Sequence, residues 1–243
     1  MKLLFILLTL ISATSLAFEA HVANYQLSIG GFKIAEEVRT LKPLEGSYFY
    51  TANAKTSGLA ALIKDYSIAA ESTFSINNAG VDSSTYQIIE REDKEISKNR
   101  SINIDSNLQV VTSALNTAQP KINNWKVNQG NIVDPLSLFL ALSFDLKNKP
   151  DQSLFSYQVA DGKSIKRYDF KKSGNQRIHL ENKDYNAIKI KRINHKSGQI
   201  EAYFLPAYQY LPALIKQTKK GRNYTYKMTT LNISTAKGLQ VVF

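Results

Sequence analysis

The stretch NIVDPLSLFLALSFDLKN, residues 131–148, decides the fold, because it predicts a helix that is apolar all round in a chain whose other apolar residues alternate. Asp134 is a favourable N-cap, and Pro135 suits the first helical position. The large apolar side chains that follow cover nearly the whole circumference of the helix: Leu136, Leu138, Phe139, Leu140, Leu142, Phe144 and Leu146. Such a helix must be buried on more than one side. Because burial of each side chain of this kind is worth about 1.5–3 kcal/mol, we expect the helix to be a main part of the core.

Strand signals precede this helix. Ala23, Tyr25, Leu27 and Ile29 alternate with other residues, and the pair Gly30-Gly31 offers the backbone geometry of a tight hairpin before the alternation resumes. Turn-forming residues separate further alternating segments, which predict strands over 47–56, 67–76, 84–92, 97–105, 108–113 and, around the single Trp, 122–127. Residues 57–66 are compatible with a helical turn or two.

Strand signals also follow the helix, over 153–160, 164–171, 176–181, 185–194 and 199–205, with a late strand around Tyr224, Tyr226 and Met228. Turns are expected at Asp161-Gly162 and at Ser173-Gly174-Asn175, where glycine permits a left-handed backbone. The pattern predicts a mainly β protein in which one strongly curved antiparallel sheet, a half-barrel or clam, is wrapped around a single apolar helix.

The first seventeen residues, MKLLFILLTLISATSLA, have the form of a secretory signal peptide, with a charged start at Lys2, an apolar run and small residues at Ser15 and Ala17. The apolar run, of about ten residues, is too short for the roughly 20 that span a bilayer. We therefore expect cleavage after Ala17, and a single β-rich domain over 18–243 without a transmembrane segment.

The chain contains no cysteine, so it has neither disulfides nor a lipid-accepting thiol. An exported protein without disulfides fits a bacterial periplasm. The formal net charge is +11, which Lys2 reduces by one when the signal segment is removed. Nucleic acid is a poor partner in that compartment, so the charge either keeps the protein soluble or attracts lipid, lipopolysaccharide or an acidic envelope protein.

Residues able to support catalysis or to hold a metal are sparse. His21, His179 and His195 are far apart and have no partners at metal-ligand spacing, so no metal site and no cofactor are predicted. The segment 88–95 contains Glu90, Glu92, Asp93 and Glu95, which could be drawn as a carboxylate pair. Basic residues interleave with them, however, and an exposed turn explains them better. No catalytic residues are assigned, and the protein is expected not to be an enzyme.

The basic stretch KQTKKGRNYTYK, residues 216–227, predicts a hairpin with Lys219, Lys220 and Arg222 at its tip. These three cations are candidate anion-binding residues for lipid headgroups or the phosphates of lipopolysaccharide. The alternative is an ordinary solvated turn whose Tyr224 and Tyr226 point into the core.

Four segments resemble a family of exported bacterial proteins known as DUF3108, whose function is not established: YQLSIGGFKIAEEVRTL (25–41), YTANAKTSGLAALI (50–63), DPLSLFLAL (134–142) and YLPALIKQTKKG (210–221). The resemblance covers nearly the whole mature chain. It implies the same fold and compartment, and it brings no catalytic residues.

The sequence favours a non-catalytic periplasmic protein that binds an apolar or lipid-like ligand, or an envelope component. Leu136, Phe139, Leu140 and Phe144 of the helix are the candidate residues of a ligand cavity. The alternative is a structural or protein-interaction protein of the envelope whose core is solid, and a hydrolase using unplaced carboxylates is a third, weaker hypothesis. Sequence alone does not distinguish a filled half-barrel from a hollow one.

Overall fold

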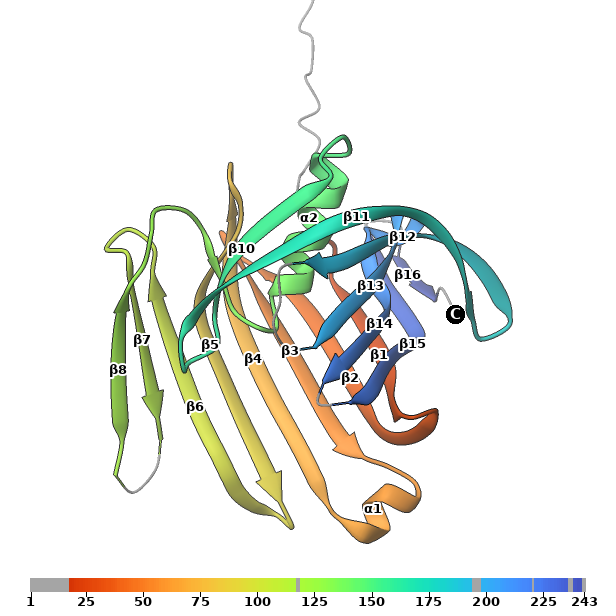
Figure 1. Cartoon of the computed structure of the whole chain (residues 1–243), viewed down its shortest axis with the longest axis horizontal. Helices are drawn as coiled ribbons and strands as arrows, with labels where there is room; N and C mark the ends of the chain where they lie inside the picture. Colours follow the sequence, from red (N-terminus) through yellow and green to blue (C-terminus); the bar gives the residue numbers. More distant parts are fainter. Residues whose placement is uncertain (1–17, 117–118, 194–197, 220, 236–237, 242–243) are drawn as a thin grey trace, which may run out of the picture.

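The computed structural model describes residues 18–241 apart from 117–118, 194–197, 220 and 236–237 (Figure 1). The predicted signal segment and His195 lie outside the described residues. The first half of the chain forms β1 (His21–Ile29), β2 (Phe32–Leu44), β3 (Ser47–Thr56), α1 (Leu59–Ile63), β4 (Tyr66–Asn77), β5 (Gly80–Glu92), β6 (Glu95–Asp105), β7 (Val110–Leu115) and β8 (Lys121–Lys126).

The second half begins with β9 (Ile132–Val133) and α2 (Leu138–Asn148). It continues with β10 (Leu154–Ala160), β11 (Ile165–Leu180), β12 (Lys183–Ile193), β13 (Gln199–Leu205), a short 3₁₀ helix (Pro206–Tyr208), β14 (Leu211–Lys219), β15 (Arg222–Thr235) and β16 (Gly238–Val241). The protein is therefore mainly β, as predicted.

All the described strands belong to one sheet, whose order is β8-β7-β6-β5-β4-β3-β2-β1-β15-β14-β13-β12-β11-β10-β9, with β16 added on β15. Neighbouring strands are antiparallel except β9 and β10, which are parallel. The chain thus runs outward from β1 to β8, passes through β9 and α2 to the opposite edge, and returns strand by strand to β15, which pairs with β1. The sheet is open, since β8 and β9 end the order.

Helix α2 is buried on most of its surface, as its composition predicted. Its buried residues are Leu138, Leu140, Ala141, Leu142, Ser143, Phe144, Asp145 and Leu146. It contacts β5, β10 and β14, strands that lie far apart in the sheet order. The hydrogen bond from Tyr157 Oη of β10 to Asp145 Oδ2, 2.6 Å long, ties the helix to one of them.

Asp134 organises the start of α2. Its Oδ1 accepts hydrogen bonds from the backbone N–H groups of Leu136 (2.8 Å) and Ser137 (3.0 Å). Its Oδ2 accepts from Ser72 of β4 (2.6 Å) and Ser83 of β5 (2.7 Å). The carboxylate therefore satisfies donors that a buried helix start would otherwise leave without partners, and it also fixes that start on the sheet.

The turn between β10 and β11 lies against β6 and β7. The carbonyl oxygen of Gly162 accepts hydrogen bonds from Arg100 Nη1 and, at 3.0 Å, from Ser113 Oγ. A Cβ at Gly162 would overlap Arg100 Cδ, and the φ of +75° is one that glycine adopts readily, so this turn favours glycine. The β10–β11 turn, from the second half of the chain, thus contacts β6 and β7, from the first half.

Several local predictions need correction. Ser173, Gly174 and Asn175 do not form a turn, because β11 continues through them with an irregular register between Lys172 and Asn175. Regular helix begins at Leu138 rather than at Pro135, although Asp134 does cap the turn before it. Ile132 and Val133 form a short strand that was not predicted. The helical turns allowed for 57–66 are present as α1.

Candidate functional site

The strand register places a row of small side chains on one face of β2 to β5. Arg39 pairs with Ala52, Ala52 with Ala70, and Ala70 with Ile88. One step nearer α1, Ala54 lies between Glu37 and Ile68. Because alanine has a single methyl group, this part of the face leaves space that larger residues fill elsewhere.

That space is a cavity of about 200 Å³. Its lining comprises the apolar residues Leu27, Ala35, Ala52, Ala54, Ile68, Ala70, Ile88, Pro135 and Leu136, the tyrosines Tyr86 and Tyr226, and the charged residues Glu37 and Arg39. Ala52 and Ala70 are buried, whereas Pro135 is exposed. The cavity therefore extends from the core to the surface beside the start of α2.

Glu37 and Arg39 form an ion pair in the cavity wall, with Arg39 Nη2 donating to Glu37 Oε2 at 2.9 Å. Their side chains are only 11% and 9% exposed. The Arg39 guanidinium also lies 4.6 Å from the centre of the Tyr25 ring. Two charged residues on a buried strand face are costly unless paired, which explains their mutual contact.

The surroundings shift the pKa values of this cluster. Burial alone would lower the pKa of Arg39, but the Glu37 carboxylate raises it well above its ordinary value. Burial raises the pKa of Tyr226, and Glu37 adds to the effect. Arg39 is thus held as a cation beside a tyrosine held neutral. Within the described part of the chain, Arg39 Nε has no hydrogen-bond partner.

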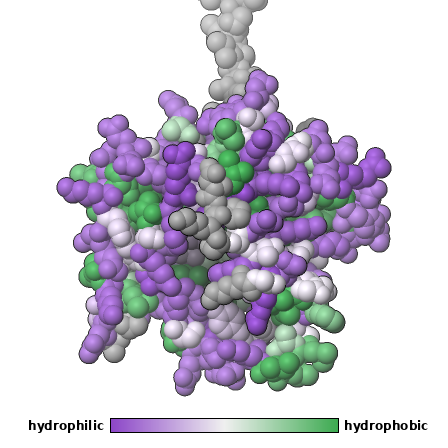
Figure 2. Space-filling view, viewed as in Figure 1, coloured by the Kyte–Doolittle hydropathy of each residue, from purple (hydrophilic) through white to green (hydrophobic). Residues whose placement is uncertain are grey.

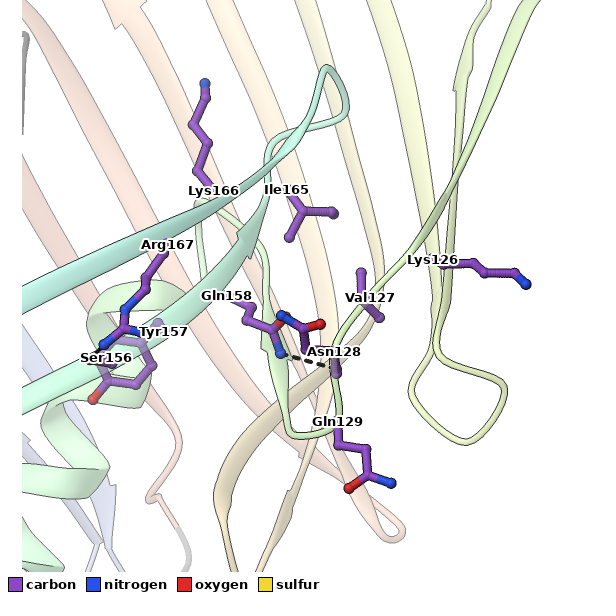
Figure 3. Close-up of a pocket in the computed structure, with 10 residues that line it drawn as sticks. All are labelled: Lys126, Val127, Asn128, Gln129, Ser156, Tyr157, Gln158, Ile165, Lys166 and Arg167. Atoms are coloured by element: carbon purple, nitrogen blue, oxygen red, sulfur yellow. Dashed lines mark hydrogen bonds between the residues drawn. The ribbon is translucent and has the colours of Figure 1, made fainter.

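A second, more open hollow of about 490 Å³ lies between the end of β8 and the β10–β11 hairpin (Figure 3). Lys126 and Lys166 extend from it in different directions, and Gln158 Nε2 donates to Asn128 O at 3.3 Å. Lys166 pairs with Asp161, and Arg167 Nε lies 2.8 Å from Asp169 Oδ1. The charged groups of this hollow do not converge on one point, so we favour the cavity beside α2.

The structure separates the four helix residues predicted to line a cavity. Leu136 lines the cavity beside Arg39. Leu140 is buried on α2, and Phe144 packs against Phe18 with ring centres 6.4 Å apart. Phe139 faces Phe204 of β13 at 6.4 Å. Only Leu136 of the four is among the residues that line this cavity.

The predicted basic hairpin tip is present. Lys219 and Arg222 are cross-strand neighbours where β14 turns into β15, and both are exposed. Lys220 lies outside the described residues. The acidic segment differs from the expectation of a wholly exposed turn, because Glu90 is partly buried. Lys98 and Tyr66 both donate to it, and these contacts lower its pKa although burial acts in the opposite direction.

Sequence reasoning missed Glu37 and Arg39. The available signal was their position, because both alternate in phase with Ala35 and Leu41, which face the core. Charged residues on the buried face of a strand mark either an ion pair or a polar site. The cross-strand alanines could not be found in this way, because their alignment depends on register.

The histidines also occupy different environments. His21 is buried in β1, its Nδ1 lies 3.1 Å from the carbonyl oxygen of Glu19, and burial lowers its pKa to about 4. His179 is exposed on β11 and pairs with Asp184. In the described ranges, no three His, Cys, Asp or Glu residues form a group suited to a metal ion.

The family model for DUF3108, a protein of unknown function, matches residues 24–229. The chain belongs to the DUF3108 family. No curated protein matches it. Among solved structures it is similar to a beta-barrel-like protein of the domain of unknown function DUF1849 from Brucella abortus, at 11% identity and a TM-score of 0.58. That match covers 88% of this chain and 98% of the other, and it supports the fold alone.

Within the parts of this DUF3108 chain that the structure describes, no helix is both long enough and apolar enough to cross a bilayer.

Proposed function

We propose that this protein binds an apolar or lipid-like ligand, without catalysing a reaction, in the cavity beside the start of α2. The observation that carries the proposal is the row of Ala52 and Ala70 between Arg39 and Ile88, which leaves about 200 Å³ unfilled. An apolar cavity of roughly 150 Å³ already accommodates benzene. The space here therefore suits one segment of an acyl chain or a small ring.

The proposed architecture is a half-barrel in which the sheet curls around α2. The contacts of α2 with β5, β10 and β14 support it, as does the meeting of Arg100 with the β10–β11 turn. In this arrangement α2 fills one part of the interior, and the alanine row leaves the adjoining part open. The ligand would lie between Leu136 and the face of β3 and β4.

Arg39 and Glu37 give this site a polar wall. A ligand with a polar end would place its apolar segment over Ala52 and Ala70 and its polar end toward the Arg39 guanidinium, whose Nε donor lacks a partner in the described part of the chain. Glu37 is paired with Arg39, and Asp134 accepts four hydrogen bonds. Both nearby carboxylates are thus engaged in structure, which favours binding over acid–base chemistry.

The rival is a structural or protein-interaction role in which the space is closed by side-chain movement. The two hypotheses differ in one observable, which is a molecule bound in the cavity.

Export to the periplasm belongs to the same proposal, with cleavage after Ala17 and a ligand or partner from the envelope. Phe18 supports this boundary, because its ring packs against Tyr48 and Phe74 with centres 5.9 and 6.3 Å away. The folded core thus includes the first residue after the proposed cut. N-terminal sequencing of protein from a periplasmic extract should begin at Phe18, and an intact Met1 in the membrane fraction would overturn export with cleavage.

Native mass spectrometry of the purified protein, followed by titration with a fluorescent medium-chain fatty acid, tests the binding proposal. Ala54→Phe places a large side chain in the cavity lining, and Ala52→Leu is a milder second variant. Val38→Phe is the matched control, since Val38 is 41% exposed and is not part of the lining.

The wild type and Val38→Phe should bind the probe, and both cavity variants should bind it at least about tenfold more weakly while melting as cooperatively as the wild type. Probe binding that the cavity variants leave unchanged, or no binding by any of the proteins, would favour the solid core.

A further inference from the structure

Four large apolar side chains are exposed together at one end of the molecule. Phe32 follows the β1–β2 turn, and Leu59, Leu62 and Ile63 belong to α1; their exposed fractions are 81%, 79%, 84% and 89%. The backbone N–H of Ser57 donates to Ile34 O at 3.0 Å, which holds α1 beside the start of β2. We call these four residues the apolar rim. Figure 2 shows the corresponding hydrophobic surface at its lower right.

Helix α1 contributes nothing to the core that would explain its composition. None of its residues is buried, and no side chain caps its first turn. Scattered apolar residues on a surface are ordinary, whereas a contiguous exposed group marks an interaction site. We therefore infer that a binding partner covers the apolar rim.

Cations lie next to the residues of the apolar rim. Lys33 follows Phe32, Lys64 follows Ile63, and Lys55 lies one residue before the end of β3. The β14–β15 turn adds Lys219 and Arg222, because Asn223 O accepts from the N–H of Gly30 at 3.1 Å and brings the two turns together. We call these five residues the basic flank: Lys33, Lys55, Lys64, Lys219 and Arg222.

The basic flank is available to a partner. Lys33 pairs with Glu36 and Lys64 with Glu92, but all four side chains are at least 42% exposed, and such pairs contribute little. Lys219 and Arg222 are exposed and have no ion-pair partner among the described residues. Carboxylates also lie beside α1, at Asp65, Glu92 and Asp93, and Glu92 is the partner of Lys64. Among the described residues, the flank cations without an ion-pair partner are therefore Lys55, Lys219 and Arg222.

We propose that the apolar rim and the basic flank form a docking surface for a bilayer that contains anionic phospholipids. The apolar side chains would enter the boundary between headgroups and acyl chains while the cations meet the lipid phosphates. Lys219 and Arg222 have no ion-pair partner in the described residues and lie next to the β1–β2 turn, so the β1–β2 and β14–β15 turns would lie nearest the lipid. The β5–β6 turn, which carries Glu92 and Asp93, would lie farther from it.

A protein partner fits this surface less well. A standard protein interface uses about 20–30 residues a side. The apolar rim has only four large apolar residues, on α1 and at the first position of β2, and their exposed side chains could insert between lipid headgroups. The same end of the sheet leads to the proposed cavity, since Ala54 and Ile68 lie on the α1 side of Ala52 and Ala70. A docked molecule would thus face the bilayer with the cavity end.

The test is co-sedimentation with vesicles of phosphatidylglycerol mixed with phosphatidylcholine, compared with phosphatidylcholine alone. The rim variant is Leu59→Ser, Leu62→Ser and Ile63→Ser together, and the flank variant is Lys219→Gln with Arg222→Gln. Leu108→Ser is the apolar control, because Leu108 is 73% exposed at the other end of β6. Lys42→Gln with Lys147→Gln is the charge control, since both lysines are exposed away from α1.

Wild-type protein should bind the anionic vesicles and release with added salt, since salt screens charges at a membrane surface. The flank variant should bind about 30-fold more weakly, equivalent to about 2 kcal/mol for two cations. The rim variant should lose at least about tenfold, because its apolar side chains no longer enter the boundary region. Both controls should bind like wild type.

If circular dichroism shows that the variants fold like wild type, the loss of vesicle binding is due to the changed surface residues. The proposal is overturned if wild type ignores anionic vesicles, if the rim variant binds as well as wild type, or if light scattering shows a dimer that the rim variant abolishes. Ala54→Phe separates the two proposals, because it blocks the cavity and should leave vesicle binding intact.

Discussion

The Oγ atom of Ser83 donates a 2.7 Å hydrogen bond to Oδ2 of Asp134, which lies 51 residues later in the chain. This bond joins β5 to the start of the buried helix α2. Both residues are fully buried or nearly so, and the backbone N–H of Asp134 donates in return to Ser83 Oγ at 3.1 Å. The start of α2 is thus fixed by reciprocal polar contacts as well as by apolar packing.

Asp134→Ala should destabilise the protein by about 3 kcal/mol or more, because it leaves two serine hydroxyls and two backbone N–H groups without their acceptor. Urea unfolding measures the loss. Asp151→Ala is the matched control, since Asp151 is exposed in the turn after α2 and should cost less than about 0.5 kcal/mol. Equal losses for the two variants would contradict the role assigned to Asp134.

Leu140→Ala should cost about 2–5 kcal/mol, as truncation of a fully buried leucine does. Leu140 is 1% exposed on α2 and belongs to the core cluster. Leu154→Ala removes the same atoms at a position that is 56% exposed, so it should change stability by less than about 0.5 kcal/mol. A small effect at Leu140, measured by chemical denaturation, would mean that α2 is peripheral to the core.

The sequence predicted α2 and the mainly β class because both depend on local periodicity. Residues 136–146 are apolar on every side, and the period of two along β3 matches its predicted bounds. The candidate cavity depends on something else, since Ala52 meets Ala70 only through the register of β3 and β4. A shift of one residue would turn every side chain to the other face, and spacing within one strand does not determine that alignment.

Non-local contacts also explain the errors along β11. Gly174 has the positive φ expected of a turn, yet the strand continues because residues on both sides of the glycine pair with the single strand β12. Likewise, Ile132 and Val133 form a strand because they pair with β10, which lies beyond α2. In both places tertiary pairing decided between local alternatives that the sequence left open.

Stability should fall as the pH drops from about 6.5 to about 4, in part because of His21. Burial lowers the pKa of His21 from 6.5 to about 4, so over this window the unfolded chain binds a proton that the folded chain does not. Stability therefore rises with pH through the window, and the contribution of His21 is on the order of 3 kcal/mol. His21→Gln should flatten this part of the pH profile, measured as the free energy of unfolding at several pH values. The exposed His179→Gln should leave the profile as in wild type.

Gly162→Ala should destabilise the protein by about 2–4 kcal/mol, the combined cost of a left-handed backbone and of overpacking. The φ of Gly162 is +75°, and a Cβ there would overlap Arg100 Cδ and lie 3.1 Å from Ser113 Oγ. Both of these side chains donate hydrogen bonds to the carbonyl oxygen of Gly162. Gly174→Ala is the matched control, because its φ is +89° but no atom lies within 4 Å of the added Cβ, so it should lose only the backbone part, about 1 kcal/mol. Urea denaturation of both variants separates the two costs. A loss at Gly162 no larger than that at Gly174 would mean that the β10–β11 turn does not rest tightly on β6 and β7, and the proposed half-barrel would lose one of the contacts between the first and second halves of the chain.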